Sequence, residues 1–178
     1  MPLTRERPRQ TDAKGFDEGM VSALGLDLGA KRIGVAGCDR TGLIATGLTT
    51  LRRTSFDSMV NPLRELIRER SVEVLVIGLP YTMDGQIGRQ AKKIQKLACR
   101  LSRSLNLPVE FVDERLTSFQ AEQMLLAERR SPSRHKELID RKAAAIILQQ
   151  WLDNRRERLD QSSDQPVGLP CSAHSLIP

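Results

Sequence analysis

The segment Ala23 to Ala36 constrains the fold more than any other part of this chain. It reads ALGLDLGAKRIGVA, two apolar runs separated by a turn that contains Gly29, and this pattern predicts two strands joined by a tight turn. Asp27 lies near the end of the first run. Because an unpaired buried charge is costly, Asp27 is expected either to bind its own backbone as a turn residue or to have a metal or basic partner.

The charge balance favours an anionic partner. The 178 residues include 28 Lys and Arg against 22 Asp and Glu, a net charge of +6. Nucleic acid is the first candidate for such a partner, although a basic protein without an anionic ligand has the same balance. The length predicts one domain, with limits at residues 21–156. The mixed charges of residues 1–20 and the Ser, Asp, Gln and Pro content of residues 157–178 predict a disordered N-terminal extension and a disordered C-terminal tail.

The three cysteines do not indicate a disulfide framework or a zinc site. Cys38, Cys99 and Cys171 are odd in number, far apart and without a CxxC spacing. We expect them to be reduced thiols of a cytoplasmic protein. No apolar run approaches the roughly 20 residues of a membrane span, so no membrane association is predicted.

The pattern beyond the first hairpin predicts an alternation of helices and parallel strands. The expected order is βββαβαβαα, a mixed five-stranded sheet of the ribonuclease H-like class within the α/β proteins. We expect Thr54 to cap the first helix, with Asp57 in the capping-box position and Pro62 weakening its start. After the hairpin, the predicted elements are a strand at 43–48, a helix from 54, a strand at 72–77, a helix over 87–105, a strand at 108–112, a helix from 117 and a helix at 136–155.

Acidic residues are predicted to converge at one edge of this sheet. Asp113 and Glu114 follow the last strand, and side-chain alternation allows only one of them to face Asp27, which leaves the choice open. Asp140 heads the apolar stripe of the last helix, and the run of alanines at 143–145 lets that helix approach the sheet. Gly29 and Gly34 would keep the hairpin slim enough for a phosphate backbone to approach.

Basic residues near these acids have two interpretations. They could bind phosphates, or they could pair with the acids in salt bridges. His135, close to Asp140 in sequence, could assist proton transfer or be a surface residue. A second basic group, six cations without an acid between residues 86 and 106, is either a phosphate-binding surface or a solvated helix face. The nucleic-acid-binding candidates beside the acids are Lys31, Arg32, Arg115 and Lys136, with Arg141 next to them.

Four segments carry a family resemblance: LGLDLGAKRIGVAGCD (24–39), VIGLPYTMDGQIG (76–88), FVDERLTSFQAE (111–122) and IDRKAAAIILQQWL (139–152). They resemble successive motifs of the YqgF family, also called RuvX. They cover most of residues 22–156 and occur in the family's order. The resemblance implies a ribonuclease H-like fold, cleavage of phosphodiester bonds with a divalent metal, and a role in maturing the 5′ end of the small-subunit ribosomal RNA. Holliday junction resolution on branched DNA is the alternative function of the family.

The chemistry of the acids predicts a metal site. Two carboxylates about 4 Å apart repel by roughly 4 kcal/mol at an effective dielectric near 20, which a cation between them would offset. Oxygen ligands without His or Cys select Mg²⁺ or Mn²⁺ over zinc. We therefore expect Asp27, Glu114 and Asp140 to be the metal ligands and catalytic residues of a nuclease.

Two other classes of protein remain open at this stage. The sequence LDLG at 26–29 is also similar to the first phosphate loop of sugar kinases and heat-shock ATPases, but the chain has no room for the second domain of such an enzyme. A catalytically idle nucleic-acid-binding factor, acting in transcription or ribosome assembly, would need the basic helix and not the acids. Neither a base-reading motif nor an aromatic platform distinguishes structured RNA from branched DNA as the substrate.

Overall fold

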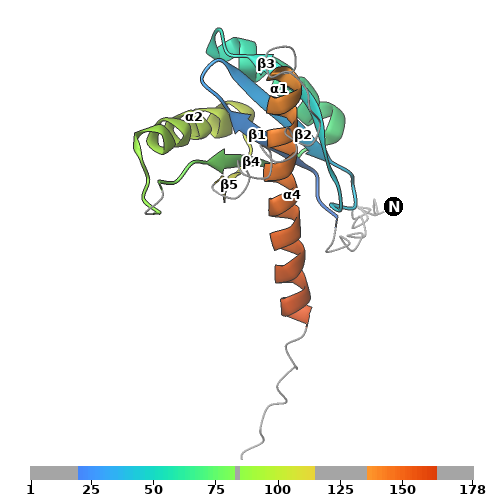
Figure 1. Ribbon diagram of the computed structural model, residues 1–178. Coiled ribbons are helices and arrows are strands. Elements are labelled where there is room, and N and C mark those ends of the chain that lie inside the picture. The colour runs from blue at the N-terminus through green and yellow to red at the C-terminus, as the bar shows by residue number, and fades with distance from the viewer. Residues whose placement is uncertain (1–19, 83–84, 115–135, 164–178) are drawn as a thin grey trace, which may run out of the picture.

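The computed structural model describes residues 20–82, 85–114 and 136–163. Its centre is a five-stranded sheet with the strand order β3-β2-β1-β4-β5 (Figure 1). The elements are β1 (Ala23–Leu28), β2 (Arg32–Cys38), β3 (Ala45–Arg52), α1 (Phe56–Arg70), β4 (Val74–Leu79), α2 (Arg89–Leu105), β5 (Val109–Asp113) and α4 (Lys136–Ser163).

The sheet has an antiparallel half and a parallel half. β1 pairs with β2, and β2 with β3, in antiparallel register, with Asp27 opposite Gly34. β4 pairs in parallel with β1 on one side and with β5 on the other. This arrangement confirms the ribonuclease H-like sheet that the sequence predicts. Because β1, β4 and β5 run in the same direction, their carboxyl ends lie at one edge of the sheet, where open α/β sheets place their ligands.

The two faces of the sheet are covered differently. α1 and α2 pack on one face through large aliphatic side chains, which join Leu26, Ile33 and Leu75 of the strands in one apolar cluster. Of the described helices, only α4 crosses the other face, as Figure 1 shows, and its residues Leu148 and Trp151 belong to a second, separate cluster. The three helices therefore make a three-layered domain with two apolar cores.

Glycines on the second face bring α4 unusually close to the strands. A Cβ atom at Gly25 would lie 2.6 Å from the Cβ of Leu148, and one at Gly47 would lie 2.9 Å from the Cβ of Arg141. A Cβ at Gly34 would collide with the main-chain oxygen of Asp140. The prediction that Gly34 leaves room for a phosphate backbone is therefore wrong, because the space beside it holds α4.

Local side-chain chemistry shifts two boundaries from their predicted places. β3 begins at Ala45 and not at residue 43, because the carboxylate of Asp39 accepts the N–H groups of Leu43 and Ile44 and holds them in the turn. The first helix is capped by Ser55 and not by Thr54. Ser55 and Ser58 form a reciprocal capping box, which satisfies two N–H groups at the helix start.

Two helices differ from their predicted course. α1 continues through Pro62, so the prediction that this proline weakens the helix start is wrong. α4 runs to Ser163 instead of ending near residue 155, and its C-terminal part projects beyond the sheet in Figure 1. The predicted disordered tail at 157–178 is thus helical over 157–163. The predicted N-terminal extension, apart from Met20, and the helix from Thr117 lie outside the described residues.

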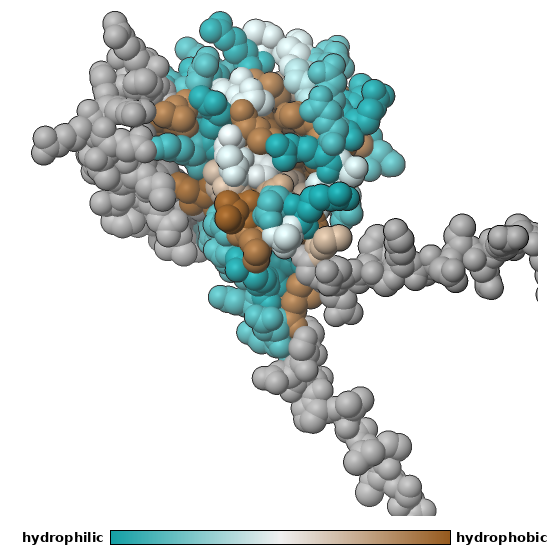
Figure 2. All heavy atoms as spheres, turned by 90° about the vertical axis from the view of Figure 1, so that its right-hand side faces the viewer, coloured by the Kyte–Doolittle hydropathy of each residue, from teal (hydrophilic) through white to brown (hydrophobic). Residues whose placement is uncertain are grey.

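The surface seen in Figure 2 is mixed, with several separate hydrophobic groups among hydrophilic residues. Leu43 and Ile44, in the turn before β3, are among the exposed large hydrophobic residues, with Ile44 64% exposed. No helix in the described part of the chain is long and apolar enough to cross a membrane. Cys38 is buried, Cys99 is exposed, and both are free thiols.

Candidate functional site

Asp27 lies one residue before the end of β1, on the central strand of the sheet. Its side chain is mostly enclosed, and burial is the main reason why its pKa rises to about 6 from an ordinary value of 3.8. The negative charge of Asp140 raises it further. The carboxylate therefore occupies a place where ionisation is unfavourable unless a positive group joins it.

Glu114 follows β5 directly and lies beside β4. Its N–H donates a hydrogen bond to the carbonyl of Leu79 (3.2 Å), which extends the pairing of the two strands by one step. Burial, then the charge of Asp27, then that of Asp113 raise the pKa of Glu114 to about 7. The structure thus brings Glu114 within electrostatic range of Asp27.

Gly78 makes room for this glutamate, a role that the sequence predictions did not include. A Cβ atom at Gly78 would collide with the Oε1 of Glu114 and lie 2.6 Å from the Cδ1 of Ile147 on α4. The signal was available, because a glycine inside an otherwise apolar strand often marks a close approach. What could not be read from the sequence is which group approaches.

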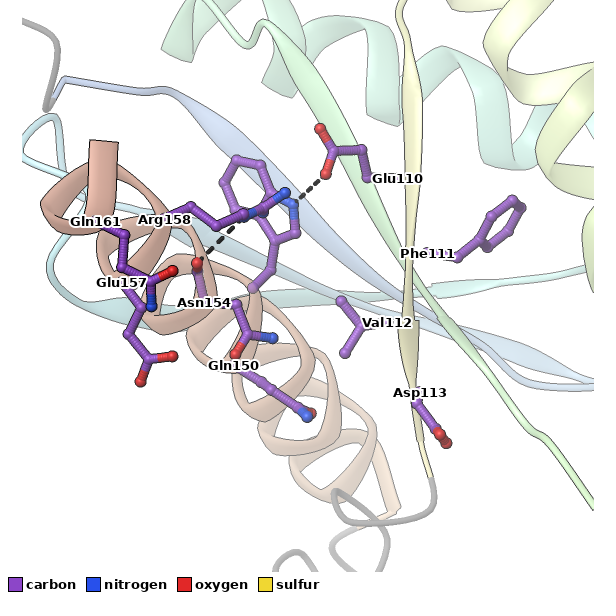
Figure 3. A pocket seen from close by; sticks show the side chains of 10 residues that line it. Glu110, Phe111, Val112, Asp113, Gln150, Asn154, Glu157, Arg158 and Gln161 are labelled. Carbon is purple, nitrogen blue, oxygen red and sulfur yellow. Dashed lines mark hydrogen bonds between the residues drawn. The ribbon is translucent and has the colours of Figure 1, made fainter. Parts of the chain in front are cut away.

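Asp113 takes part in a different feature. It lines a hollow of about 470 Å³ between β5 and the C-terminal part of α4, and in Figure 3 its carboxylate points away from the helix. At the other end of the hollow, the Nε1 of Trp151 donates a hydrogen bond to the Oε2 of Glu110 (2.7 Å). Its lining residues are Glu110, Phe111, Val112, Asp113, Gln150, Trp151, Asn154, Glu157, Arg158 and Gln161.

Asp140 lies in the second turn of α4, above β2. The Nε of Arg32 donates to its Oδ2 at 2.5 Å, an ion pair in which both side chains are partly buried. The start of α4 is also held by the Oγ1 of Thr50 on β3, which donates to the carbonyl of Glu137 (2.7 Å). These contacts fix Asp140 over the same end of β1 that carries Asp27.

The predicted phosphate-binding residues lie in several places. Arg32 pairs with Asp140, which agrees with the second of its two interpretations and leaves its role towards phosphate a prediction. Lys31, in the turn between β1 and β2, is exposed, and so is Lys136, the first residue of α4. Arg115 and His135 lie outside the described residues.

The carboxylates suit a hard divalent cation in their chemistry. Asp27, Glu114 and Asp140 offer only oxygen atoms, the ligands that Mg²⁺ and Mn²⁺ take in proteins. A cation would also offset the burial and mutual repulsion that raise two of their pKa values. In the part of the chain that the structure describes, however, no three His, Cys, Asp or Glu side chains are grouped closely enough to hold a metal. Asp140 would have to turn from Arg32 to join the other two.

Among solved structures, the RuvC protein of Thermus thermophilus in complex with a Holliday junction substrate aligns with this chain. The two are 14% identical with a TM-score of 0.49, and the alignment covers 79% of this chain and 96% of that one. A second structure of Thermus thermophilus RuvC is 12% identical to this chain, with a TM-score of 0.46.

Among curated relatives, two bacterial proteins named "Putative pre-16S rRNA nuclease" align over most of the domain. The one from Trichormus variabilis is 67% identical over 142 residues, which are 80% of this chain and 94% of that protein. The one from Thermosynechococcus vestitus is 62% identical over 138 residues, 78% and 91% of the two chains. The profile of the RuvX family, described as Holliday junction resolvase, matches residues 21–154. The chain therefore belongs to the RuvX family.

Proposed function

We propose that this protein is a metal-dependent nuclease of the cytoplasm that cleaves phosphodiester bonds in structured RNA and matures the 5′ end of pre-16S ribosomal RNA. One observation carries the proposal. Asp27, at the carboxyl edge of the parallel strands, lies within electrostatic range of two acids that are far from it in sequence, Glu114 and Asp140. The name of the relatives from Trichormus variabilis and Thermosynechococcus vestitus, "Putative pre-16S rRNA nuclease", supports ribosomal RNA as the substrate.

The residues of the chain have separate tasks in this proposal. Asp27, Glu114 and Asp140 would hold Mg²⁺ or Mn²⁺, which when bound supplies activation of water and stabilisation of the leaving oxygen. Arg32 pairs with the carboxylate of Asp140 while no metal is bound, and it keeps a positive charge at the edge of the site. Lys31, in the turn after β1, and Lys136, at the start of α4, are exposed and would contact the phosphates of the substrate, as would Arg115.

Cleavage of a four-way DNA junction is the second candidate function. The description of the RuvX family as Holliday junction resolvase favours it. Both reactions hydrolyse a phosphodiester bond, so the same acids would serve either substrate. The two candidates differ only in the nucleic acid that the surrounding surface accepts.

A comparison of the two substrates tests the proposal. Purified protein with Mg²⁺ or Mn²⁺ is incubated with precursor 16S RNA and, separately, with a four-way DNA junction. We expect cleavage at the 5′ side of the mature RNA, no cleavage in EDTA, and loss of cleavage in Asp27→Asn. Cleavage of the junction alone would move the function to the second candidate.

Absence of any cleavage would contradict both candidates. If the wild-type chain binds RNA or DNA but cuts neither with Mg²⁺ or Mn²⁺, the protein is a nucleic-acid-binding factor. If Asp27→Asn cleaves as well as the wild type, the assignment of Asp27 to the metal site is wrong. Asp39→Asn is the matched control, because it changes an acid of the same hairpin that lies away from the site.

A further inference from the structure

The net charge of the chain is concentrated on one helix. α2 contains six basic residues and no acid, whereas the rest of the chain carries 22 basic and 22 acidic residues. All six basic side chains are exposed, and the buried side of the helix is apolar. The cations of the outer face of α2 are Arg89, Lys92, Lys93, Lys96, Arg100 and Arg103.

These charges work against the stability of their own helix. The N-terminal end of a helix is its positive end and favours acids, yet α2 begins with Arg89, has no acid in its first turn and has no side-chain cap at Gly88. Like charges also face each other one turn apart, as Lys92 and Lys96 do, and such pairs destabilise a helix. Of the ion pairs formed between described residues, none includes α2.

The neighbouring helix shows that the chain can arrange its charges differently. α1 has a capping box, Asp57 in its first turn and Arg68 and Arg70 in its last, all of which suit the helix dipole. It packs on the same face of the sheet as α2. The basic face of α2 is therefore not a general property of the helices of this protein, and no acid among the described residues forms an ion pair with it.

The topology places this face next to the candidate site. β4 ends at Leu79, whose carbonyl binds the N–H of Glu114, and the chain then leads to the start of α2 at Arg89. α2 runs back along the sheet from that edge for about 25 Å, at 1.5 Å per residue. α2 lies on the face opposite α4, whereas Glu114 and Asp140 lie on the α4 side, so a nucleic acid held at the acids would pass round this edge of the sheet to reach α2 (Figure 1).

We propose that the outer face of α2 binds the phosphate backbone of the nucleic acid at a distance from the cleaved bond. This inference rests on the proposed function, because it assumes a nucleic acid at the acids. A membrane surface is a poorer occupant, since the apolar side of α2, including Leu97 and Leu101, is buried in the core and cannot enter a bilayer. Arg100 is held in place over the ring of Phe56 (4.2 Å) and would present its remaining donors outward.

The salt dependence of binding tests this surface. The double variant Lys92→Gln/Lys96→Gln is compared with the control Arg40→Gln/Arg68→Gln, which removes the same charge from exposed sites elsewhere. Binding of precursor 16S RNA and of a four-way junction is measured in EDTA from 50 to 300 mM salt. For the α2 variant we expect the slope of log Kd against log salt to fall by about 1.4 to 1.8, with binding roughly 25- to 60-fold weaker at 0.1 M salt.

The outcomes separate this inference from the proposed function. Because binding is measured without cleavage, an α2 variant that loses slope supports the inference even if the wild-type chain cuts no substrate. An α2 variant with the slope of the wild type and of the control overturns it, even if the wild type is a nuclease. A second result would also overturn the inference: the wild type binds anionic phospholipid vesicles, the α2 variant does not, and both bind the two nucleic acids equally well. Thermal unfolding shows that the variant folds, and its Tm should not fall, since a like-charge pair is removed.

Discussion

Two aspartates of the first hairpin, Asp27 and Asp39, have opposite environments. Asp39 follows β2 in an exposed turn, where its carboxylate accepts hydrogen bonds from the hydroxyl of Thr41 and from the N–H groups of Thr41, Leu43 and Ile44. These bonds, that of the Thr41 hydroxyl first, lower its pKa to about 2. Asp27 is enclosed beside another acid, and its pKa rises to about 6.

The difference separates an acid that serves the fold from an acid that serves a site. The ionised form of Asp39 stabilises its turn, because every one of its bonds is to a group of the same turn. The ionised form of Asp27 destabilises the folded chain, because folding removes water from it and brings Asp140 near. An ionised residue that lowers the free energy of unfolding, at a position where a nonpolar or neutral side chain would fit, is a candidate for function.

The largest expected contrast is in cleavage. Glu114→Gln keeps the size of the side chain but removes the charge that faces Asp27, and we expect at least a ~100-fold slower rate with Mg²⁺ or Mn²⁺. Asp39→Asn should cleave close to the wild-type rate. The rates are compared under single-turnover conditions on the substrate that the wild type cuts. Equal rates for Glu114→Gln and the wild type would remove Glu114 from the site.

The next contrast is in the pH dependence of stability without metal. Since the pKa of Asp27 is raised by folding, the folded chain holds more protons than the unfolded chain between about pH 4 and 6, and its stability falls as the pH rises through this range. Asp27→Asn should therefore be more stable than the wild type at pH 8, by at most about 3 kcal/mol, and not at pH 4.

Asp39→Asn should show the reverse sign. The lowered pKa of Asp39 stabilises the folded chain above about pH 4, and this stabilisation is lost as the pH falls towards 2. The variant should be less stable than the wild type at neutral pH. Urea unfolding in EDTA from pH 2 to 8 measures both variants. A stability of Asp27→Asn below that of the wild type at pH 8 would contradict the comparison.

A smaller effect is expected from the glycines of β2. A Cβ at Gly34 meets the backbone of α4 at Asp140, so Gly34→Ala should lower the free energy of unfolding by about 1 to 3 kcal/mol. A Cβ at Gly37 meets the ends of the side chains of Leu48 and Arg70, which can move. Gly37→Ala is therefore the matched control with a smaller loss. Equal losses in urea unfolding would show that α4 can shift as readily as those side chains.

The smallest effect is expected at the turn itself. Thr41→Val removes the hydroxyl that donates to Asp39 and leaves the three N–H groups in place. The pKa of Asp39 should rise part of the way to its ordinary value of 3.8, which NMR titration measures. The pKa of Asp27 should not change. An unchanged pKa of Asp39 would mean that the backbone donors alone hold it low.

Sequence patterns predicted the sheet, and for local reasons they singled out Asp27 and Asp140 as site candidates. Asp27 interrupts an apolar strand, and Asp140 heads an apolar helix stripe, so each is visible without its partners. The choice between Asp113 and Glu114 was not predictable, because Glu114 lies one residue beyond β5, where strict alternation no longer applies. The roles of Gly34 and Gly78 depend on where α4 crosses the sheet, which only the tertiary packing determines.

α4 is the last element of the described chain to be synthesised. During synthesis the five strands leave the ribosome before residues 136–163. The face of the sheet that carries Gly25 and Gly34 is therefore made before α4, the helix that packs on it. The contact between Gly25 and Leu148 spans more than a hundred residues, and contacts of this length form slowly. Asp27 and Asp140 meet only when that contact closes. A nascent chain therefore lacks the complete candidate site until α4 packs on the sheet.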